Sequence, residues 1–158
     1  MTRRYGLIAA LVVLIADQAS KWWLIGLLAT HPFGIRLTPF FNLVQVWNRG
    51  VSFGMFNMGE SGGRWILVGL ALVMAAALLV WLGRVAQRHL AIAIGAIIGG
   101  ALGNAVDRLH HGAVADFLDF HLGRWHWPAF NLADSAIVLG VAVLLIDALF
   151  RRPEEANR

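Results

Sequence analysis

Two short motifs each place an aspartate beside one apolar segment of the chain. Val114-Ala115-Asp116-Phe117 precedes the segment, and Phe130-Asn131-Leu132-Ala133-Asp134-Ser135 lies at its start. A carboxylate near hydrocarbon is expensive, so an intramembrane acid indicates a functional site. Two carboxylates a few ångströms apart do not both ionise easily, so one keeps a proton while the other acts as a base. The pair predicts activation of a shared water, which attacks a carbonyl polarised by the protonated acid.

Asp119 is a rival to Asp116 for this role. Residues 114–120 are typical of a strand, and residues three apart on a strand point to opposite faces. Only one of these two aspartates can therefore face Asp134.

Other polar residues interrupt the apolar segments at helical spacing. Asp17 and Lys21 are four residues apart, so they share one helix face and can pair, either as a structural pair or as part of a site. Further polar residues share helix faces in the same half of the predicted membrane, and this common depth indicates one site: Asn104, Asp107, Arg108, Asn131 and Asp134. Asp147 is different, because an ordinary interfacial pair with Arg151 explains it.

Two other catalytic templates occur in the sequence. Gly50-Val51-Ser52-Phe53-Gly54 matches the nucleophile-elbow pattern, but that motif needs a strand–turn–helix in a soluble α/β sheet. A glycine-bracketed turn close to a ligand is the better interpretation. Four histidines, His110, His111, His121 and His126, resemble a metal cluster, yet no H-E-x-x-H motif accompanies them. We therefore expect neither a serine nucleophile nor a metal, and no cofactor.

Composition defines the elements that must position these residues. The 158 residues are 59% hydrophobic and 14% charged, which favours an integral membrane protein of one domain, residues 1–158. The net charge of +4 comes from scattered arginines that form no basic face, so nucleic-acid binding is excluded. The absence of cysteine excludes disulfides and a thiol nucleophile. Four segments are long enough to span a membrane, at about residues 6–29, 65–82, 90–109 and 132–150.

Arginine placement predicts the orientation of these spans. Arg3 and Arg4 precede the first span, Arg84 and Arg88 link the second and third, and Arg151 and Arg152 follow the fourth. The positive-inside rule then places both termini in the cytoplasm and connections 30–64 and 110–131 on the other side.

The two outer connections contain more than loops. Residues 40–56 mix aromatic and β-branched residues with Asn-Arg-Gly and Phe-Gly breaks, and residues 114–120 read as a strand before a Leu122-Gly123 turn. Tryptophans 47, 65, 125 and 127 suit a membrane interface. The predicted fold is an all-α polytopic membrane protein of four transmembrane helices, with a small amphipathic β-platform on the outer leaflet.

Five motifs in order resemble the lipoprotein signal peptidases (signal peptidase II), four-span aspartic proteases of bacterial membranes. The resemblance covers nearly the whole chain, with one departure at Val51, where alanine is expected. The motifs are Asp17-x-x-x-Lys21, Asn48-x-Gly50-x-x-Phe53-Gly54, Asn104-x-x-Asp107-Arg108, Val114-x-Asp116-Phe117 and Phe130-Asn131-x-Ala133-Asp134-Ser135.

The resemblance implies that Asp116 and Asp134 are the catalytic dyad. It implies a diacylglyceryl-modified prolipoprotein as substrate, cut before the lipidated cysteine in the bacterial inner membrane, without metal or organic cofactor and with inhibition by globomycin. It also implies an extracytoplasmic β-cradle and a mobile outer helix within residues 54–64. The remaining motif residues would support the site: Asp17, Lys21, Asn48, Gly50, Phe53, Gly54, Asn104, Asp107, Arg108, Asn131 and Ala133.

Two rival classes stay open at this point. The same acids could form a proton relay in a small transporter or channel component, although the chain has no inverted repeat. An intramembrane serine hydrolase built on Ser52 is the other alternative.

Overall fold

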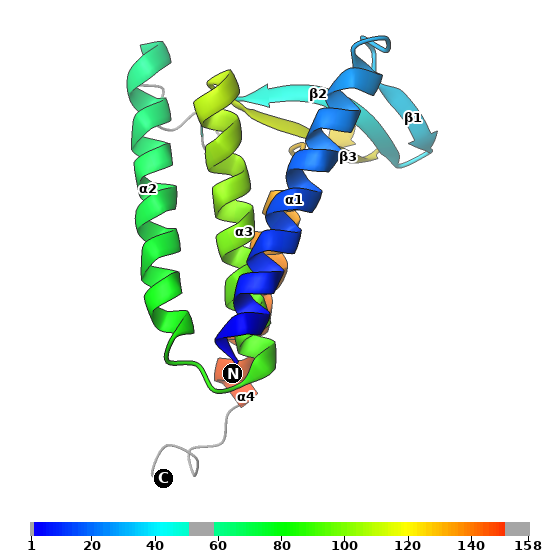
Figure 1. Cartoon of the computed structure of the whole chain (residues 1–158). Helices are drawn as coiled ribbons and strands as arrows, with labels where there is room; N and C mark the ends of the chain where they lie inside the picture. The colour runs from blue at the N-terminus through cyan, green and yellow to red at the C-terminus, as the bar shows by residue number, and fades with distance from the viewer. Residues whose placement is uncertain (1, 51–58, 151–158) are drawn as a thin grey trace.

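The computed structural model describes residues 2–50 and 59–150 of the chain. Its long helices are α1 (Arg3–Leu28), α2 (Gly59–Leu82), α3 (Arg88–His111) and α4 (Leu132–Phe150). Within the described residues, these four helices, α2 from Gly63 onward, are long and apolar enough to cross a membrane. In lipid a helix satisfies every backbone polar group within one segment, which is why such apolar runs fold as helices. The predicted four-helix membrane fold is confirmed (Figure 1).

Helix α3 is the centre of the bundle, and each of the other three helices packs against it. In its most apolar stretch 67% of the residues are buried inside the protein, against 22% in α1 and 11% in α4. The exposed apolar side chains of α1, α2 and α4 are the surfaces available to lipid.

Glycines on α3 let its neighbours approach to backbone contact. A Cβ atom on Gly95 would collide with the Gly6 carbonyl group of α1, and one on Gly99 would collide with the Ala10 carbonyl. On the opposite side, a Cβ atom on Gly100 would meet the Ala133 carbonyl of α4. Small residues of this kind allow close van der Waals packing where lipid offers no hydrophobic driving force between helices.

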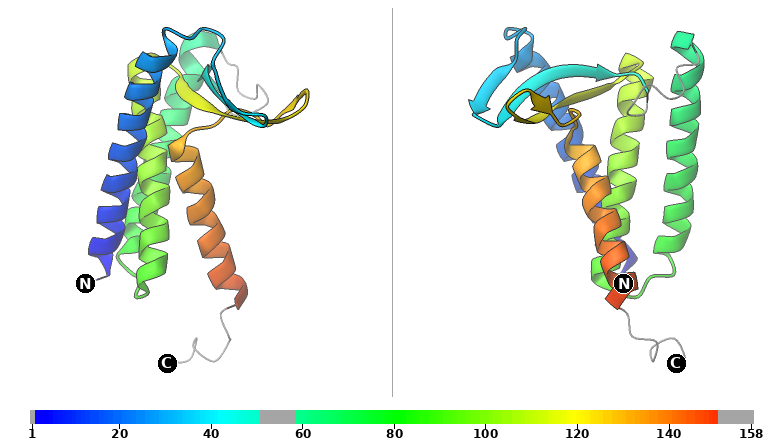
Figure 2. Two further views of the ribbon diagram at one scale, coloured as in Figure 1. Left: turned by 90° about the vertical axis from the view of Figure 1, so that its right-hand side faces the viewer. Right: turned by 180° about the vertical axis from the view of Figure 1, so that it is seen from behind.

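One antiparallel sheet lies at the end of the bundle opposite the N-terminus. Its strands are β1 (Ile35–Thr38), β2 (Phe41–Asn48), β3 (Val114–Leu122) and β4 (Trp125–His126), in the order β1-β2-β3-β4. Figure 2 shows the sheet extending sideways from this end, above the start of α4. The two outer connections, far apart in sequence, therefore form one platform.

The predicted strands agree with the structure only in part. β2 and β3 lie in the regions predicted to contain strands, and the predicted turn contains Gly123 in a left-handed conformation with φ 61°. β1 was not predicted, because its four residues mix arginine and threonine with only two apolar residues. β2 contains one extra residue between Leu43 and Val46, where the pairing with β3 shifts register.

The short outer helix expected within residues 54–64 falls partly on residues 54–58, which lie outside the described residues. Residues 59–64 form the first turns of α2.

Candidate active site

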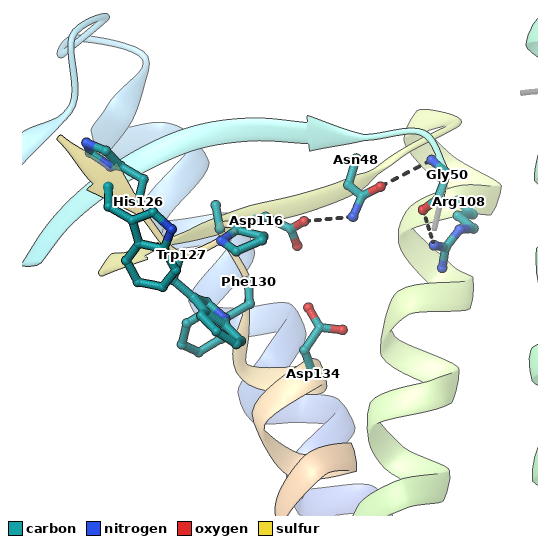
Figure 3. A pocket seen from close by; sticks show the side chains of 11 residues that line it. Asn48, Gly50, Arg108, Asp116, His126, Trp127, Phe130 and Asp134 are labelled. Carbon is teal, nitrogen blue, oxygen red and sulfur yellow. Dashed lines mark hydrogen bonds between the residues drawn. The ribbon is translucent and has the colours of Figure 1, made fainter. Parts of the chain in front are cut away.

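A cavity of about 700 Å³ contains both predicted catalytic aspartates. Asp116 comes from β3 and Asp134 from the first turn of α4, so two separate elements deliver the two acids (Figure 3). Asn48 and Gly50 at the end of β2, Arg108 of α3 and residues 125–130 complete the lining. We call residues 125–130 the aromatic wall, because three of the six side chains are Trp125, Trp127 and Phe130.

Asp116 is 2% exposed and accepts hydrogen bonds at both carboxylate oxygens. Asn131 Nδ2 donates to Oδ1 at 2.7 Å, and Asn48 Nδ2 donates to Oδ2 at 3.1 Å. Burial, followed by the negative charge of Asp134, raises the pKa of Asp116 to about 6, although the two donors and Lys21 oppose the shift. Asp116 is therefore the acid of the pair that retains a proton more readily than an ordinary aspartate.

Asp134 is held by a reciprocal cap at the N-terminus of α4. Asn131 precedes the helix, and its Oδ1 accepts the Asp134 backbone N–H at 2.9 Å. The Asp134 Oδ2 atom accepts the Asn131 backbone N–H at 3.3 Å. This is the geometry of a capping box, in which two otherwise unpaired backbone donors are satisfied together. The Asn-x-x-Asp spacing thus sets the carboxylate position as well as the helix start.

Asn104 joins the cap to a buried ion cluster. Its Nδ2 donates to Asp134 Oδ1 at 2.8 Å, while its Oδ1 accepts from Lys21 Nζ at 3.0 Å and from Asn131 Nδ2 at 3.2 Å. With its oxygen facing two donors, the Asn104 amide can present only N–H groups to Asp134. Lys21 therefore sets the orientation of the amide that contacts the dyad.

The ion cluster itself consists of Asp17, Lys21 and Asp107. Lys21 Nζ lies 2.8 Å from Asp17 Oδ2 and 2.9 Å from Asp107 Oδ2, and all three side chains are nearly inaccessible to solvent. The i,i+4 spacing predicted the first pair, whereas the second joins α1 to α3 and was not specifically predicted. A buried cation is tolerated only where charges and hydrogen bonds compensate it, as they do here.

Both acids of this cluster also accept backbone N–H groups from the elements that carry the dyad. Asp17 Oδ1 accepts the Ala133 N–H at the start of α4 at 2.9 Å. Asp107 Oδ2 accepts the Ala115 N–H, one residue before Asp116, at 3.1 Å. The cluster thus ties the backbone beside each catalytic candidate to the centre of the bundle.

The remaining supporting residues lie on the far wall of the cavity. Arg108 Nη1 donates to the Asn104 carbonyl at 3.3 Å and Nη2 to the Gly50 carbonyl at 3.5 Å. Gly50 N–H donates to Asn48 Oδ1 at 3.1 Å. Phe53, Gly54, Val51 and the rival nucleophile Ser52 lie outside the described residues.

Asp119 does not line the cavity. Asn42 Nδ2 donates to its Oδ2 at 2.9 Å, and His126 Nδ1 lies 2.8 Å from its Oδ1. Of the two aspartates on β3, Asp116 is the one beside Asp134. Within residues 2–50 and 59–150, no group of three or more His, Cys, Asp or Glu side chains is arranged to hold a metal ion.

Comparison with known proteins gives the family. The family described as Signal peptidase (SPase) II matches residues 9–150. The chain is 51% identical over 153 residues to the lipoprotein signal peptidase of Methylorubrum extorquens (strain PA1), covering 95% of this chain and 88% of the relative. Identity to the Burkholderia cenocepacia lipoprotein signal peptidase is 46% over 145 residues, covering 90% and 86%. The chain belongs to the signal peptidase II family.

A solved structure agrees with this assignment. A bacterial membrane enzyme determined by the in meso method at 1.9 Å resolution superposes with a TM-score of 0.77 and 29% identity, covering 93% of this chain and 94% of that one. The signal peptidase II family consists of membrane peptidases, so the predicted class of enzyme and the predicted resemblance are confirmed. Membership of this peptidase family also excludes the alternative that the chain is a transporter or channel component.

Sequence reasoning missed two polar side chains that donate hydrogen bonds to aspartates of this signal peptidase II family member. Gln18 Nε2 donates to Asp107 Oδ1 at 2.9 Å and to Asp17 Oδ2 and the Gly103 carbonyl at 3.2 Å each. Its position within a predicted span was a usable signal, because polar side chains in spans usually face a partner. Asn42 is the other, and its pairing with Asp119 depends on the strand register, which no local pattern gives.

Proposed function

We propose that this protein removes the signal peptide from lipid-modified prolipoproteins, with Asp116 and Asp134 as the catalytic dyad. The observation that carries the proposal is the shared contact through Asn131. One side chain donates to Asp116 and caps the residue that carries the other acid, so both carboxylates are held beside one cavity. Aspartic peptidase chemistry needs this arrangement of two acids around one water.

The two acids have different surroundings, and this supports different roles. Asp134 accepts N–H groups from the Asn104 side chain and from the Asn131 backbone, so each of its carboxylate oxygens faces a donor. Asp116 has a raised pKa of about 6. In our proposal Asp134 takes a proton from the water while the protonated Asp116 donates a hydrogen bond to the scissile carbonyl oxygen. The water oxygen then bonds to the carbonyl carbon while the carbonyl oxygen takes the proton of Asp116, which gives a diol. As the diol collapses, its C–N bond breaks, Asp134 delivers its proton to the leaving amine, and one diol hydroxyl returns a proton to Asp116.

The aromatic wall and the names of the relatives support a lipoprotein precursor as the substrate. The relatives in Methylorubrum and Burkholderia are named lipoprotein signal peptidases. Trp125, Trp127 and Phe130 offer apolar surface on one side of the cavity, which suits the diacylglyceryl group at the new N-terminal cysteine. We propose that cleavage occurs before that cysteine and that a globomycin-type cyclic peptide competes for the same cavity.

Arginines at the end of the bundle farthest from the sheet support the orientation. Arg3, Arg4, Arg84 and Arg88 lie at the ends of α1, α2 and α3 farthest from the sheet (Figure 1). By the positive-inside rule this end faces the cytoplasm, together with both termini. The sheet and the cavity then lie at the outer leaflet, where a translocated precursor presents its cleavage site.

The test uses detergent-purified protein and one precursor in two forms, with and without its diacylglyceryl group. We expect the lipidated form to be cut before the modified cysteine, as read by mass spectrometry, and globomycin to block the reaction. The unlipidated form lacks the membrane anchor and the wall contact, so its cleavage should be much slower. Equal rates for both forms would remove the lipid from substrate recognition.

A further inference from the structure

A second buried carboxylate lies on β3 beyond the dyad. The Asp119 side chain is 8% exposed, and its Oδ1 and Oδ2 lie 2.8 and 3.0 Å from His126 Nδ1. Asn42 Nδ2 donates to Oδ2 at 2.9 Å. The His126 ring also stacks on His121, with ring centroids 4.9 Å apart. Asp119 therefore joins β2, β3 and β4 through side chains alone.

Asp119 remains a carboxylate in this setting. Burial acts to raise its pKa, but hydrogen bonds from His126 and Asn42 and the charges of His126 and His121 outweigh burial, and the pKa lies below its ordinary value. A hydrogen bond to an ionised acceptor is about twice as strong as one between neutral groups.

Three backbone hydrogen bonds between Phe130 and residues 117–118 of β3 fix the far end of the aromatic wall, whereas the near end depends on the short strand that Asp119 contacts. β4 contains two residues, and its pairing with β3 comprises only His121 with His126 and Leu122 with Trp125. Immediately after it, Trp127 N–H donates to the Phe120 carbonyl at 2.8 Å. So short a ribbon is marginal without side-chain contacts across it. The Asp119–His126 pair supplies such a contact.

The aromatic wall begins at this strand. Residues 125–130 provide six of the eleven residues that line the cavity. His126 lies at the end of the cavity far from Asp134 (Figure 3), so it is not placed to act on the water of the dyad.

We propose that Asp119 and His126 are positioning residues that hold the aromatic wall against the apolar part of the substrate and so determine substrate affinity. The inference rests on the proposed function for the identity of the substrate. It gives Asp119 a role in substrate binding, whereas Asp116 has its role in the cleavage chemistry.

Alanine substitutions separate binding from chemistry. We expect Asp119→Ala and His126→Ala each to raise KM for the lipidated precursor about tenfold, as loss of a charge-assisted hydrogen bond would, with kcat within about twofold of the parent. The double variant should be no worse than either single one, because both remove the same contact. Arg124→Ala, an exposed charge in the same hairpin turn, is the matched control and should leave both constants unchanged. Dissociation constants measured in an Asp116→Asn background should change in parallel with KM.

A covalent replacement for the pair gives a sharper test. His121 and His126 are directly opposed on β3 and β4, where Cα atoms lie about 4.5–5.5 Å apart, within the range a disulfide requires. The chain has no cysteine, so the double variant His121→Cys/His126→Cys has only these two cysteines, which can form a disulfide only with each other within one chain. The oxidised form should have near-parental KM, and reduction of the same sample should raise it.

Three outcomes would overturn the inference. One is a fall in kcat at constant KM in the alanine variants, since the pair would then act on the dyad. A second is an equally raised KM in the oxidised and reduced cysteine forms, which would mean that the imidazole itself contacts substrate. The third is unchanged kinetics in both alanine variants. Failure of the proposed function is distinguishable, because it would appear as full activity in Asp116→Asn of the otherwise unaltered protein.

Discussion

The side-chain amide of Asn131 donates a 2.7 Å hydrogen bond to Asp116 Oδ1 and thereby joins the start of α4 to β3. The same side chain is fully buried and accepts the Asp134 backbone N–H through its oxygen. The nitrogen of this amide thus contacts the Asp116 carboxylate, and its oxygen contacts the backbone of Asp134, the other acid of the proposed dyad. A residue in this position couples the geometry of the two acids, so neither can move independently of the other.

The first prediction concerns the two acids. Asp116→Asn and Asp134→Asn should each reduce turnover by at least about a hundredfold, because asparagine keeps the shape but cannot exchange the proton that acid–base catalysis requires. Initial rates on a lipidated precursor give the measurement. Asp147→Asn makes the same chemical change at the far end of α4 and should leave the rate intact. Either dyad variant retaining more than about a hundredth of the activity would show that the dyad is wrongly assigned.

The second prediction concerns pH. Since the pKa of Asp116 is raised to about 6, this acid keeps its proton to higher pH than an ordinary aspartate and loses it as pH rises. A one-proton dyad should therefore lose kcat/KM on the alkaline side. Asn48 donates to Asp116 and favours its charged form, so Asn48→Ala should move this alkaline limb to higher pH. An unmoved alkaline limb, with the acidic limb displaced to higher pH instead, would indicate that Asp116 is the base.

The third prediction concerns the buried lysine. Lys21→Met leaves Asp17 and Asp107 without their shared cation, and breaking a buried pair in this way costs about 3–5 kcal/mol of stability. Thermal inactivation in detergent should reveal the loss. Adding Asp107→Asn removes one of the two uncompensated charges and should restore part of the stability. No recovery in the double variant would show that the charge balance is not what the lysine provides.

The fourth prediction concerns a glycine outside the cavity. A Cβ atom on Gly103 would collide with the Asp17 carboxylate, which accepts the Ala133 N–H beside the dyad. Gly103→Ala should therefore lower activity severalfold by displacing Asp17. Gly26→Ala is the matched control, because nothing lies within 4 Å of a Cβ atom there. Equal effects of the two substitutions on the cleavage rate would contradict this account.

The fifth prediction concerns orientation. Because the chain has no cysteine, single-cysteine variants can be labelled without background. Arg124→Cys in the β3–β4 turn should react with a membrane-impermeant thiol reagent from the outside, whereas Arg84→Cys at the other end should react only after the membrane is opened. The reverse pattern would place the cavity in the cytoplasmic leaflet.

The sequence by itself determined the four helices and the local geometry around the proposed dyad. Long apolar runs specify spans because lipid offers no partner for backbone polar groups. Spacings of three and four residues specify contacts within one helical turn, which is why the Asp17–Lys21 pair and the shared face of Asn131 and Asp134 follow from the chain alone. The reciprocal cap between Asn131 and Asp134 was not predicted and is a finding of the structure.

Only the tertiary structure decided which residues from different elements meet. Strand alternation predicted that one of Asp116 and Asp119 faces Asp134, but not which, since that depends on the pairing of β3 with β2 and on how the sheet lies over the start of α4 (Figure 2). The contacts of Lys21 with Asp107 and of Asp17 with Ala133 depend on close helix packing against the glycines of α3. The periodicity of a sequence indicates which face of its own helix or strand a residue occupies. Which other element that face contacts is decided by the packing between elements.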